Sequence, residues 1–207
     1  MRLYLVDLLR CPEPHIESWL VASTGVMQDR HVLEGELGCP HCGTRYRVHK
    51  GTVEFSDRKP ARLDSSEPGA GAVLRLAALL ALDSAEGAIL LARTYASIAR
   101  ALRDATSVEV VQLDPPADVQ MGRGMSGIAG ARLAPFAEGS LRGAALDPDT
   151  AEPAFLRSVV KALRSRGRLV APAATPLPLD MKELARDEKE WVAEKQGATP
   201  VVPLRRA

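Results

Sequence analysis

The chain has 207 residues, of which 46% are apolar and 26% charged, enough for one α/β domain and a small module. Its formal net charge of +1 provides no strong field for nucleic acid or anionic lipid, so nucleic-acid binding would need a local basic patch. No run approaches the ~18 consecutive apolar residues of a membrane span, and the N-terminal sequence lacks the features of a secretory signal. We therefore expect a cytoplasmic protein without a membrane segment.

Three cysteines mark the N-terminal part of the chain. Cys39 and Cys42 form a CxxC pair, whose short loop lets two thiolates reach one ion, and Cys11 precedes them. An odd number of cysteines that includes such a pair favours metal binding or reduced thiols over a disulfide framework. Structural zinc takes four tetrahedral Cys or His ligands. Pro14 stands where a second CxxC pair would end, and the adjacent His15 can replace the missing ligand. We predict a zinc site formed by Cys11, His15, Cys39 and Cys42.

Other histidines and other roles stay open at this point. His31 and His49 are alternative fourth ligands, whereas His41 lies between two ligands and is expected to point away. A ribbon that has lost its metal and is held by packing is a second interpretation. A redox-active CxxC is a third, although such a motif usually opens a helix within a βαβ unit.

The sequence around these cysteines resembles a known family. The segments LVDLLRCPEPH and EGELGCPHCGTRYRVHKGTVEF are similar to the small zinc-ribbon proteins that act as activator subunits of tRNA, rRNA and protein methyltransferases. The match covers residues 3–55, and the missing second cysteine is its departure from the family pattern. The resemblance implies a methyltransferase or translation-related protein partner. Because a ribbon strand can extend the methyltransferase sheet in that family, it also implies that this ribbon could extend the sheet of its own chain.

A linker and a second pattern follow the ribbon. Residues 56–71 are polar, contain two prolines and two glycines, and lack an apolar period, so they are the predicted linker. We predict a zinc-ribbon-like module over residues 1–55 and a Rossmann-like domain over residues 72–207.

Helices and strands alternate in the second half of the chain. Short apolar runs such as residues 88–92 are typical of strands buried on both faces of a parallel sheet. Pro153 and Gly167 mark the start and end of a helix, and Asp180 with Glu183 resembles a capping box. Helices are predicted to begin near residues 72, 97, 153 and 180, and strands to cover residues 88–92, 108–113, 128–133, 143–146, 168–171 and 201–202. The alternation predicts the α/β class, with a mostly parallel sheet and helices on both faces.

Two passages carry a resemblance to class I S-adenosylmethionine-dependent methyltransferases. Residues 132–147, RLAPFAEGSLRGAALD, are similar to that family's passage into its fourth strand, and residues 154–170 are similar to the helix and fifth strand that follow. The resemblance covers about residues 72–206. It implies a Rossmann-like domain and makes S-adenosylmethionine the cofactor to be tested.

The donor site predicted from this resemblance departs from the family. A glycine-rich loop after the first strand normally lets backbone N–H groups approach the ligand, but residues 93–97 contain no glycine. Side chains there, Tyr95 above all, would crowd the donor. Asp114 stands near the place of the acidic residue that accepts the ribose hydroxyls, although it can equally be a turn aspartate before Pro115. Thr94 and Asp114 are therefore the candidate cofactor contacts.

Two further motifs have competing interpretations. Residues 122–127 match GxGxxG, but the motif follows a loop and leads into a predicted strand, which favours a flexible loop over a phosphate cradle. Asp147 and Asp149 follow the fourth strand, where they could contact substrate or begin a helix.

Three hypotheses for function follow. The first, which the glycine-free loop favours, is a non-catalytic pseudo-methyltransferase that acts as a scaffold or activator. The second is an active methyltransferase with an atypical donor loop. The third is a zinc-ribbon interaction protein whose α/β half binds another small ligand. The first predicts that Tyr95 or its neighbours fill the donor pocket, and that the ribbon or a sheet edge exposes an apolar patch.

Overall fold

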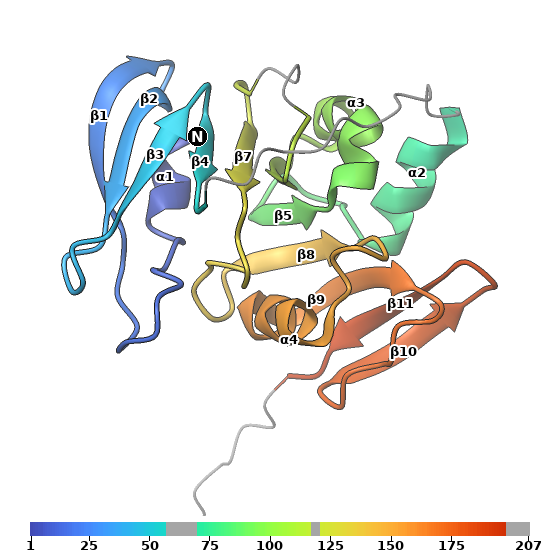
Figure 1. Cartoon of the computed structure of the whole chain (residues 1–207). Coiled ribbons are helices and arrows are strands. Elements are labelled where there is room, and N and C mark those ends of the chain that lie inside the picture. The colour runs from blue at the N-terminus through green and yellow to red at the C-terminus, as the bar shows by residue number, and fades with distance from the viewer. Residues whose placement is uncertain (57–69, 117–120, 198–207) are drawn as a thin grey trace, which may run out of the picture.

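A computed structural model describes residues 1–56, 70–116 and 121–197 of the chain. Its helices and strands run in the following order (Figure 1): α1 (Leu3–Val6), β1 (Val21–Gln28), β2 (His31–Gly38), β3 (Arg45–His49), β4 (Thr52–Glu54), α2 (Ala70–Leu79), β5 (Ala88–Leu91), the 3₁₀ turn η1 (Arg93–Tyr95), α3 (Ala96–Thr106), β6 (Glu109–Leu113), β7 (Met125–Ala129), β8 (Leu141–Ala145), α4 (Pro153–Ala162), β9 (Leu163–Pro172), β10 (Met181–Arg186) and β11 (Glu190–Lys195).

The described strands form one sheet, in the order β1-β2-β3-β4-β7-β6-β5-β8-β9-β11-β10. Strands β4, β7, β6, β5, β8 and β9 run parallel to one another, while the ribbon strands and the β10–β11 hairpin pair antiparallel. Counted from β5 along the chain, the segment β7-β6-β5-β8-β9 reads 3-2-1-4-5, which is the order of a doubly wound sheet. The predicted α/β, Rossmann-like fold class is confirmed.

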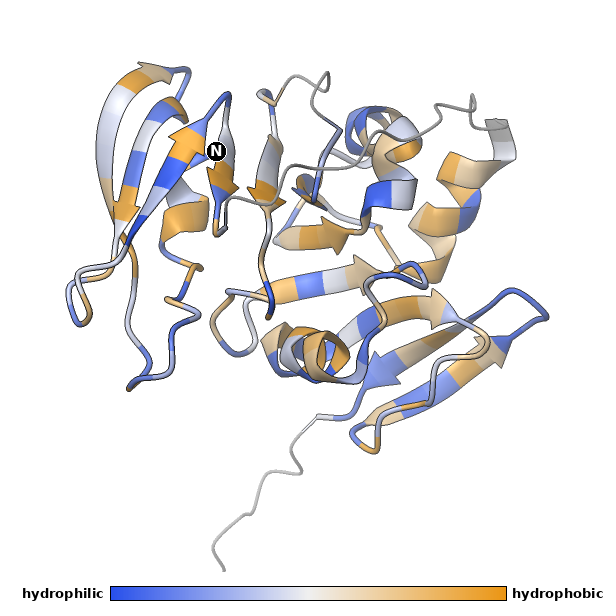
Figure 2. Ribbon diagram, in the orientation of Figure 1, coloured by the Kyte–Doolittle hydropathy of each residue, from blue (hydrophilic) through white to orange (hydrophobic). Residues whose placement is uncertain are grey.

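Strand β5 lies at the centre of this sheet and is hydrophobic along its whole length (Figure 2). Its side chains alternate between two apolar clusters, as the period of a strand requires. Ala88 and Leu90 join the cluster that contains the buried side of α4, and Ile89 and Leu91 join the cluster that contains α2 and α3. Helices therefore cover both faces of the sheet, which is why the strand reads as a continuous apolar run.

The ribbon continues the same sheet. Strand β4 pairs in parallel with β7, in the register Thr52 to Gly127, Val53 to Ile128 and Glu54 to Ala129. This is the arrangement that the family resemblance implied for a fused chain. Val53 and Ile128 belong to one buried cluster, which reaches from the ribbon to α4. The two modules thus share a hydrophobic core.

Helix α1 covers a part of the sheet that lacks a crossover helix. The connections after β6 and β7 contain no helix in their described residues, 114–116, 121–124 and 130–140. Leu5 and Leu9 instead pack in the cluster of Ile128, and the Ala137 N–H donates to the Leu8 carbonyl oxygen at 2.7 Å. Parallel neighbours usually need a helix to cross over and bury their face. The N-terminal segment supplies that cover.

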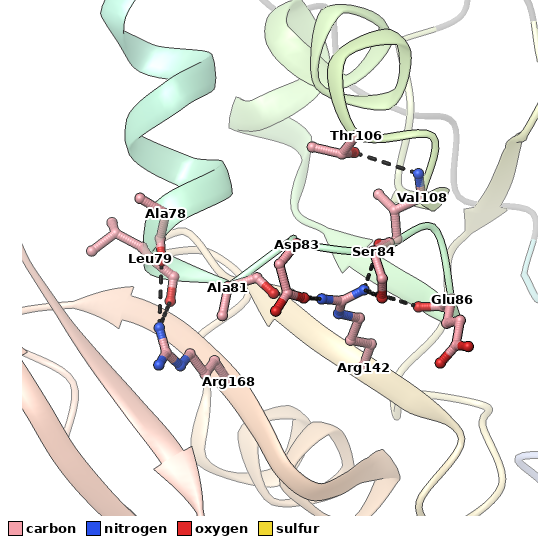
Figure 3. Close-up of polar contacts among 10 residues, drawn as sticks. All are labelled: Ala78, Leu79, Ala81, Asp83, Ser84, Glu86, Thr106, Val108, Arg142 and Arg168. Atoms are coloured by element: carbon pink, nitrogen blue, oxygen red, sulfur yellow. Dashed lines mark hydrogen bonds and ion pairs between the residues drawn. The ribbon is translucent and has the colours of Figure 1, made fainter.

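Two arginines fasten α2 to the sheet at the amino-terminal end of β5 (Figure 3). Arg142, on β8, is buried, and its guanidinium donates hydrogen bonds to the loop between α2 and β5. The acceptors are the carbonyl oxygens of Ala81, Ser84 and Glu86, the Ser84 hydroxyl and the Asp83 carboxylate. Arg168, on β9, donates to the carbonyl oxygens of Ala78 and Leu79, 3.4 and 3.3 Å away. Carbonyls at a helix C-terminus lack partners within the helix, so both arginines have a structural role there.

The helix predicted from residue 180 is wrong. Residues 181–195 form the antiparallel hairpin β10–β11, with Arg186 opposite Trp191. The Asp187 carboxylate accepts hydrogen bonds from the N–H groups of Lys189 and Glu190 at 2.8 and 2.9 Å, which closes the turn. Pairing of β11 with β9 then buries Trp191 completely. The helical spacing of the apolar residues was coincidental, because Leu184 is exposed.

Several predicted boundaries moved. The helix that Pro153 opens ends at Ala162, so Gly167 lies inside β9 instead of ending the helix. The strand predicted at residues 128–133 is β7, Met125–Ala129. Most of the predicted linker and the predicted strand at residues 201–202 lie outside the described residues.

Gly127 lets β4 approach β7. A Cβ atom at this position would lie 2.2 Å from the Thr52 hydroxyl oxygen, closer than real Cβ contacts. We predict that Gly127→Ala lowers the free energy of unfolding by roughly 1–3 kcal/mol, as overpacking does. Urea denaturation measures the loss.

The Thr52 side chain provides the matched test. Since Thr52→Ala removes the hydroxyl and methyl groups that a Cβ atom at residue 127 would meet, Gly127→Ala combined with Thr52→Ala should cost less than the sum of the two single substitutions. Gly38→Ala, where a Cβ atom meets nothing within 4 Å, should be near neutral. If the losses in unfolding free energy from the Gly127 and Thr52 substitutions simply add, Gly127 does not serve the close approach of β4 to β7.

His31 joins the ribbon to the loop before β7. Its side chain is buried; Nδ1 lies 3.1 Å from the Asp29 carbonyl oxygen, and Nε2 lies 3.2 Å from the Gly124 N–H. Nδ1 therefore donates and Nε2 accepts, which requires the neutral ring. Burial lowers the pKa of His31, and the positive charges of the N-terminus and Arg2 lower it further.

Because the folded pKa of His31 lies below its unfolded value, the unfolded chain binds more protons in acid. Stability should therefore be greatest above the unfolded pKa of about 6.5 and fall as the pH drops below it. We predict that His31→Gln, which keeps an acceptor but cannot titrate, flattens this dependence in thermal melts between pH 5 and 8. The exposed His41, changed to Gln, is the control. If the dependence of Tm on pH is unchanged in the His31 variant, the neutral His31 ring does not contribute to stability as proposed.

Candidate metal centre and donor face

Four side chains meet at one end of the ribbon. The ligand atoms of Cys11, His15, Cys39 and Cys42 all lie within 4.8 Å of one another, so the group could hold a metal ion. The Cys11 and Cys42 sulfurs are 3.8 Å apart, and the Cys39 sulfur is 3.5 Å from His15 Nε2. Tetrahedral zinc, with Zn–S of about 2.3 Å and Zn–N of about 2.0–2.1 Å, separates two sulfurs by about 3.8 Å and a sulfur from a nitrogen by about 3.5 Å. The donor set fits zinc in chemistry, and these two distances match the edges of a zinc tetrahedron.

Local backbone structure presents the two thiols of the CxxC pair. Cys39 follows β2, and the chain turns back into β3 through Gly43, whose φ is +73°. The Gly43 N–H donates to the Cys39 carbonyl oxygen, and the Cys39 N–H donates to that of Thr44, both at 2.9 Å. Glycine adopts this left-handed conformation without steric cost. The turn therefore brings Cys39 and Cys42 to the same side.

His15 is oriented by its own neighbour. Its Nδ1 lies 2.6 Å from the Ile16 carbonyl oxygen, and this bond raises the pKa of His15. Donation by Nδ1–H leaves Nε2 free to face Cys39, as in metal sites where a second partner fixes the ring. The His41 ring packs at a tilt of 42° against His15, with centroids 4.6 Å apart, outside the ligand group.

The two alternative histidine ligands lie elsewhere in the fold. His31 bonds Gly124, and His49 Nδ1 lies 3.1 Å from a carboxylate oxygen of Glu34. Sequence reasoning did not find Tyr46, whose hydroxyl lies 3.3 Å from the Cys11 sulfur beneath the cluster. An isolated tyrosine on a strand gives no signal for such a contact.

The thiols differ in their readiness to ionise. Burial raises the pKa of Cys11 to about 11. Burial also opposes ionisation of Cys39, but hydrogen bonds from the N–H groups of Cys42 and His41 outweigh it and hold the pKa of Cys39 at about 6. Since metals bind thiolate, Cys39 is the ligand best prepared before a metal arrives.

We predict about one zinc ion per chain in protein prepared without chelator, because three thiols and an imidazole lie within 4.8 Å of one another, the donor types that structural zinc takes. Cys39→Ala should lose the zinc and lower Tm by about 10 °C, the equivalent of roughly 3 kcal/mol in a chain of this size. Elemental analysis by mass spectrometry and thermal melts measure the two effects.

Histidine substitutions test the ligand assignment. His15→Ala should lose zinc, whereas His41→Ala should keep it, because only the first ring belongs to the ligand group. Zinc bound equally by both variants would remove His15 from the site, and wild-type protein without zinc would remove the site itself.

The second candidate site lies at the carboxyl ends of β5 and β8, where the strand order reverses. Ligands of doubly wound sheets bind in the crevice at this place. Two contacts bridge it: the Arg93 guanidinium pairs with Asp149 at 3.0 Å, and the Thr94 N–H donates to Asp147 at 3.4 Å. Asp147 is buried, and its other oxygen accepts bonds from Thr150. The chain's own groups thus connect the two strand ends.

Asp114 is also engaged within the protein. It follows β6 with a φ of +47°, and its carboxylate accepts the Gly130 N–H at 2.7 Å. This bond joins the end of β6 to the residue after β7. No hydrogen bond in the described part of the chain connects Thr94 to Asp114.

Tyr95 packs toward α2. With Thr94, Arg75 and Glu190 it lines a groove of about 240 Å³ between α2, α3 and β11, smaller than the ~300–1,000 Å³ of most ligand pockets. Tyr95 also packs against the apolar cluster of α2 and α3. Burial raises the pKa of its hydroxyl, and the carboxylates of Glu190 and Asp147 raise it further.

The GxGxxG match belongs to a loop and a strand. Gly122 and Gly124 precede β7, and Gly127 lies inside it, against Thr52. No helix follows the motif before β8 in the described residues 121–140. A phosphate cradle of this type needs a helix N-terminus, so the glycines serve the loop and the docking of β4.

No protein-family model matches the chain, and no curated protein sequence matches it. Solved structures give partial alignments. They include the antibiotic-resistance methyltransferase Kmr, at 14% identity over 68% of this chain and 97% of that one, with a TM-score of 0.41. Geranyl diphosphate C-methyltransferase from Streptomyces coelicolor aligns at 15% identity over 56% of this chain and 51% of that one, with a TM-score of 0.42. Phosphoethanolamine N-methyltransferase 2 from Haemonchus contortus aligns at 10% identity over 51% and 28%, with a TM-score of 0.41.

In the part of the chain that the structure describes, no helix is long and apolar enough to cross a membrane.

The chain spans only about half of the geranyl diphosphate C-methyltransferase and a smaller share of the phosphoethanolamine enzyme. The fold class therefore rests on the strand order of the chain itself, a Rossmann-like sheet extended by a ribbon with a metal-capable Cys/His cluster.

Proposed function

We propose that this protein is a methyltransferase-like scaffold or activator, with a structural zinc ion in its ribbon and no catalytic methyl transfer of its own. The observation that carries the proposal is the set of contacts at the carboxyl ends of β5 and β8. Arg93, after β5, pairs with Asp149, after β8, and Asp147 accepts the Thr94 N–H. A methyl donor would have to break these contacts to reach the backbone.

The residues around these strand ends support the same interpretation. Residues 92–98 contain no glycine, so a side chain projects at every position where a donor needs bare backbone. The Asp114 carboxylate, the candidate for the ribose hydroxyls, accepts the Gly130 N–H instead. The loop after β5 therefore lacks the bare backbone that a donor needs, and the Asp114 carboxylate already has a partner.

The proposed role of zinc is to stabilise the fold of the ribbon. When bound, the ion would be held by Cys11, His15, Cys39 and Cys42 and would supply folding free energy. Four protein ligands would complete the tetrahedron of a structural zinc ion, which would leave no position for a substrate or a water. The resemblance of residues 3–55 to methyltransferase activators makes a methyltransferase or translation-related protein the partner class that we propose.

Calorimetry tests the catalytic half of the proposal. We predict no saturable heat when S-adenosylmethionine or S-adenosylhomocysteine is titrated to millimolar concentration into the full chain, because binding would cost the contacts made by Arg93 and Asp147. An active class I methyltransferase titrated in parallel is the positive control, and zinc content confirms an intact ribbon.

A saturable heat that disappears in both Asp114→Asn and Asp147→Asn would overturn the proposal and restore the active-enzyme hypothesis. In that case the two carboxylates would be donor contacts instead of internal acceptors.

A further inference from the structure

The two edges of the sheet differ in chemistry. Strand β10, at one edge, carries Lys182, Glu183 and Arg186, and charged side chains are a common protection against edge-to-edge pairing. Strand β1, at the other edge, has eight residues, Val21–Gln28, and none is charged or proline. Figure 1 shows it as the outermost ribbon strand. Its open backbone is the template that an incoming strand needs.

Apolar side chains accompany this open edge. Val21 is 60% exposed, and Val26 and Met27 are each 52% exposed. An exposed apolar patch on the ribbon or on a sheet edge is what a partner-binding role predicts. Regular pairing with β2 runs from Val21 to Thr24, before the register shifts, so this half of β1 is the straight part of the edge.

A groove lies beside the same half of β1. It has a volume of about 600 Å³ and runs between α1 and the start of β1, with Leu3, Val6, Leu20 and Ala22 among its walls. This volume lies within the ~300–1,000 Å³ that binding pockets usually have. An extended segment paired with β1 would point every second side chain to one face, where the groove can receive it.

Charge at the two ends of the groove limits what can bind. Arg30 lines one end, where its carbonyl oxygen accepts the Leu3 N–H, and its side chain makes no hydrogen bond or ion pair within the described part of the chain. Asp7 lines the end beyond the C-terminus of α1. Arg2, also in the wall, is paired with Glu109. Arg30 is therefore the cation in the groove that is available to an acidic group of an occupant.

We propose that β1 and this groove form a docking site for an extended segment of a partner protein, which adds a strand to the sheet beside Val21–Thr24. The segment carries apolar side chains that enter the groove and an acidic side chain that pairs with Arg30. The site lies on the ribbon, away from the carboxyl ends of β5 and β8, so it does not depend on the proposed loss of catalysis.

A peptide selection tests the site with the full chain. Random twelve-residue peptides displayed on phage are selected on the wild-type protein, and the enriched peptides are synthesised and measured by fluorescence anisotropy. The expected peptides alternate apolar or β-branched residues and contain Asp or Glu. Arg30→Glu and, separately, Val21→Asp should each weaken their binding about tenfold or more.

The controls separate this site from its alternatives. Leu184→Asp, a matched change on the opposite sheet edge, should leave peptide binding unchanged, and thermal melts confirm that each variant is folded. Failure to enrich any peptide, enrichment of basic peptides, or binding that neither groove variant alters would overturn the proposal. A dimer in sedimentation velocity that Val21→Asp dissociates would also overturn it, because a second copy would then occupy β1.

Discussion

Parallel pairing of β4 with β7 is the contact on which the rest of the architecture depends. It turns a ribbon and a doubly wound sheet into one continuous sheet, and it sets the ribbon's apolar side chains against those of the central strands. The close approach requires Gly127 opposite Thr52, because any side chain at that glycine would meet the threonine. The metal-capable cluster lies where β2 turns into β3, and β3 pairs with β4. A bound ion would therefore stabilise the β2–β3 hairpin, whose strand β3 pairs with β4.

Pairing with the ribbon also provides cover for one face of the α/β sheet. A parallel sheet usually buries its faces under crossover helices, yet α1 and the segment after it cover the face beside Ile128. The fused module thus substitutes for helical cover, in the same chain, and the apolar core runs without a break from Tyr46 in the ribbon to Phe155 on α4. Loss of the ribbon would expose part of the sheet's core, so the two modules are physically interdependent.

At the carboxyl ends of β5 and β8, the contacts are polar and internal to the chain. Polar groups that could have served a ligand are satisfied there by one another, with Asp147 and Asp149 accepting from residues of η1. Buried polar groups need partners, and here the Thr94 N–H and Thr150 supply them to the buried Asp147 carboxylate. Strand β1, at the ribbon edge of the sheet, carries no charged residue, so its edge lacks the charged side chains that β10 has.

The amino-acid sequence by itself determined the features that depend on near neighbours. The CxxC spacing, His15 beside Pro14 and the buried run at residues 88–92 are local signals, and the structure places them in a metal-capable cluster and a central strand. Tertiary contacts decided the rest. Residues 181–195 have a helical period, yet pairing with β9 makes them a hairpin, because burying Trp191 in the sheet outweighs local propensity. Likewise, only the fold shows that Gly127 and His31 join the two modules, since their partners Thr52 and Gly124 are distant in sequence.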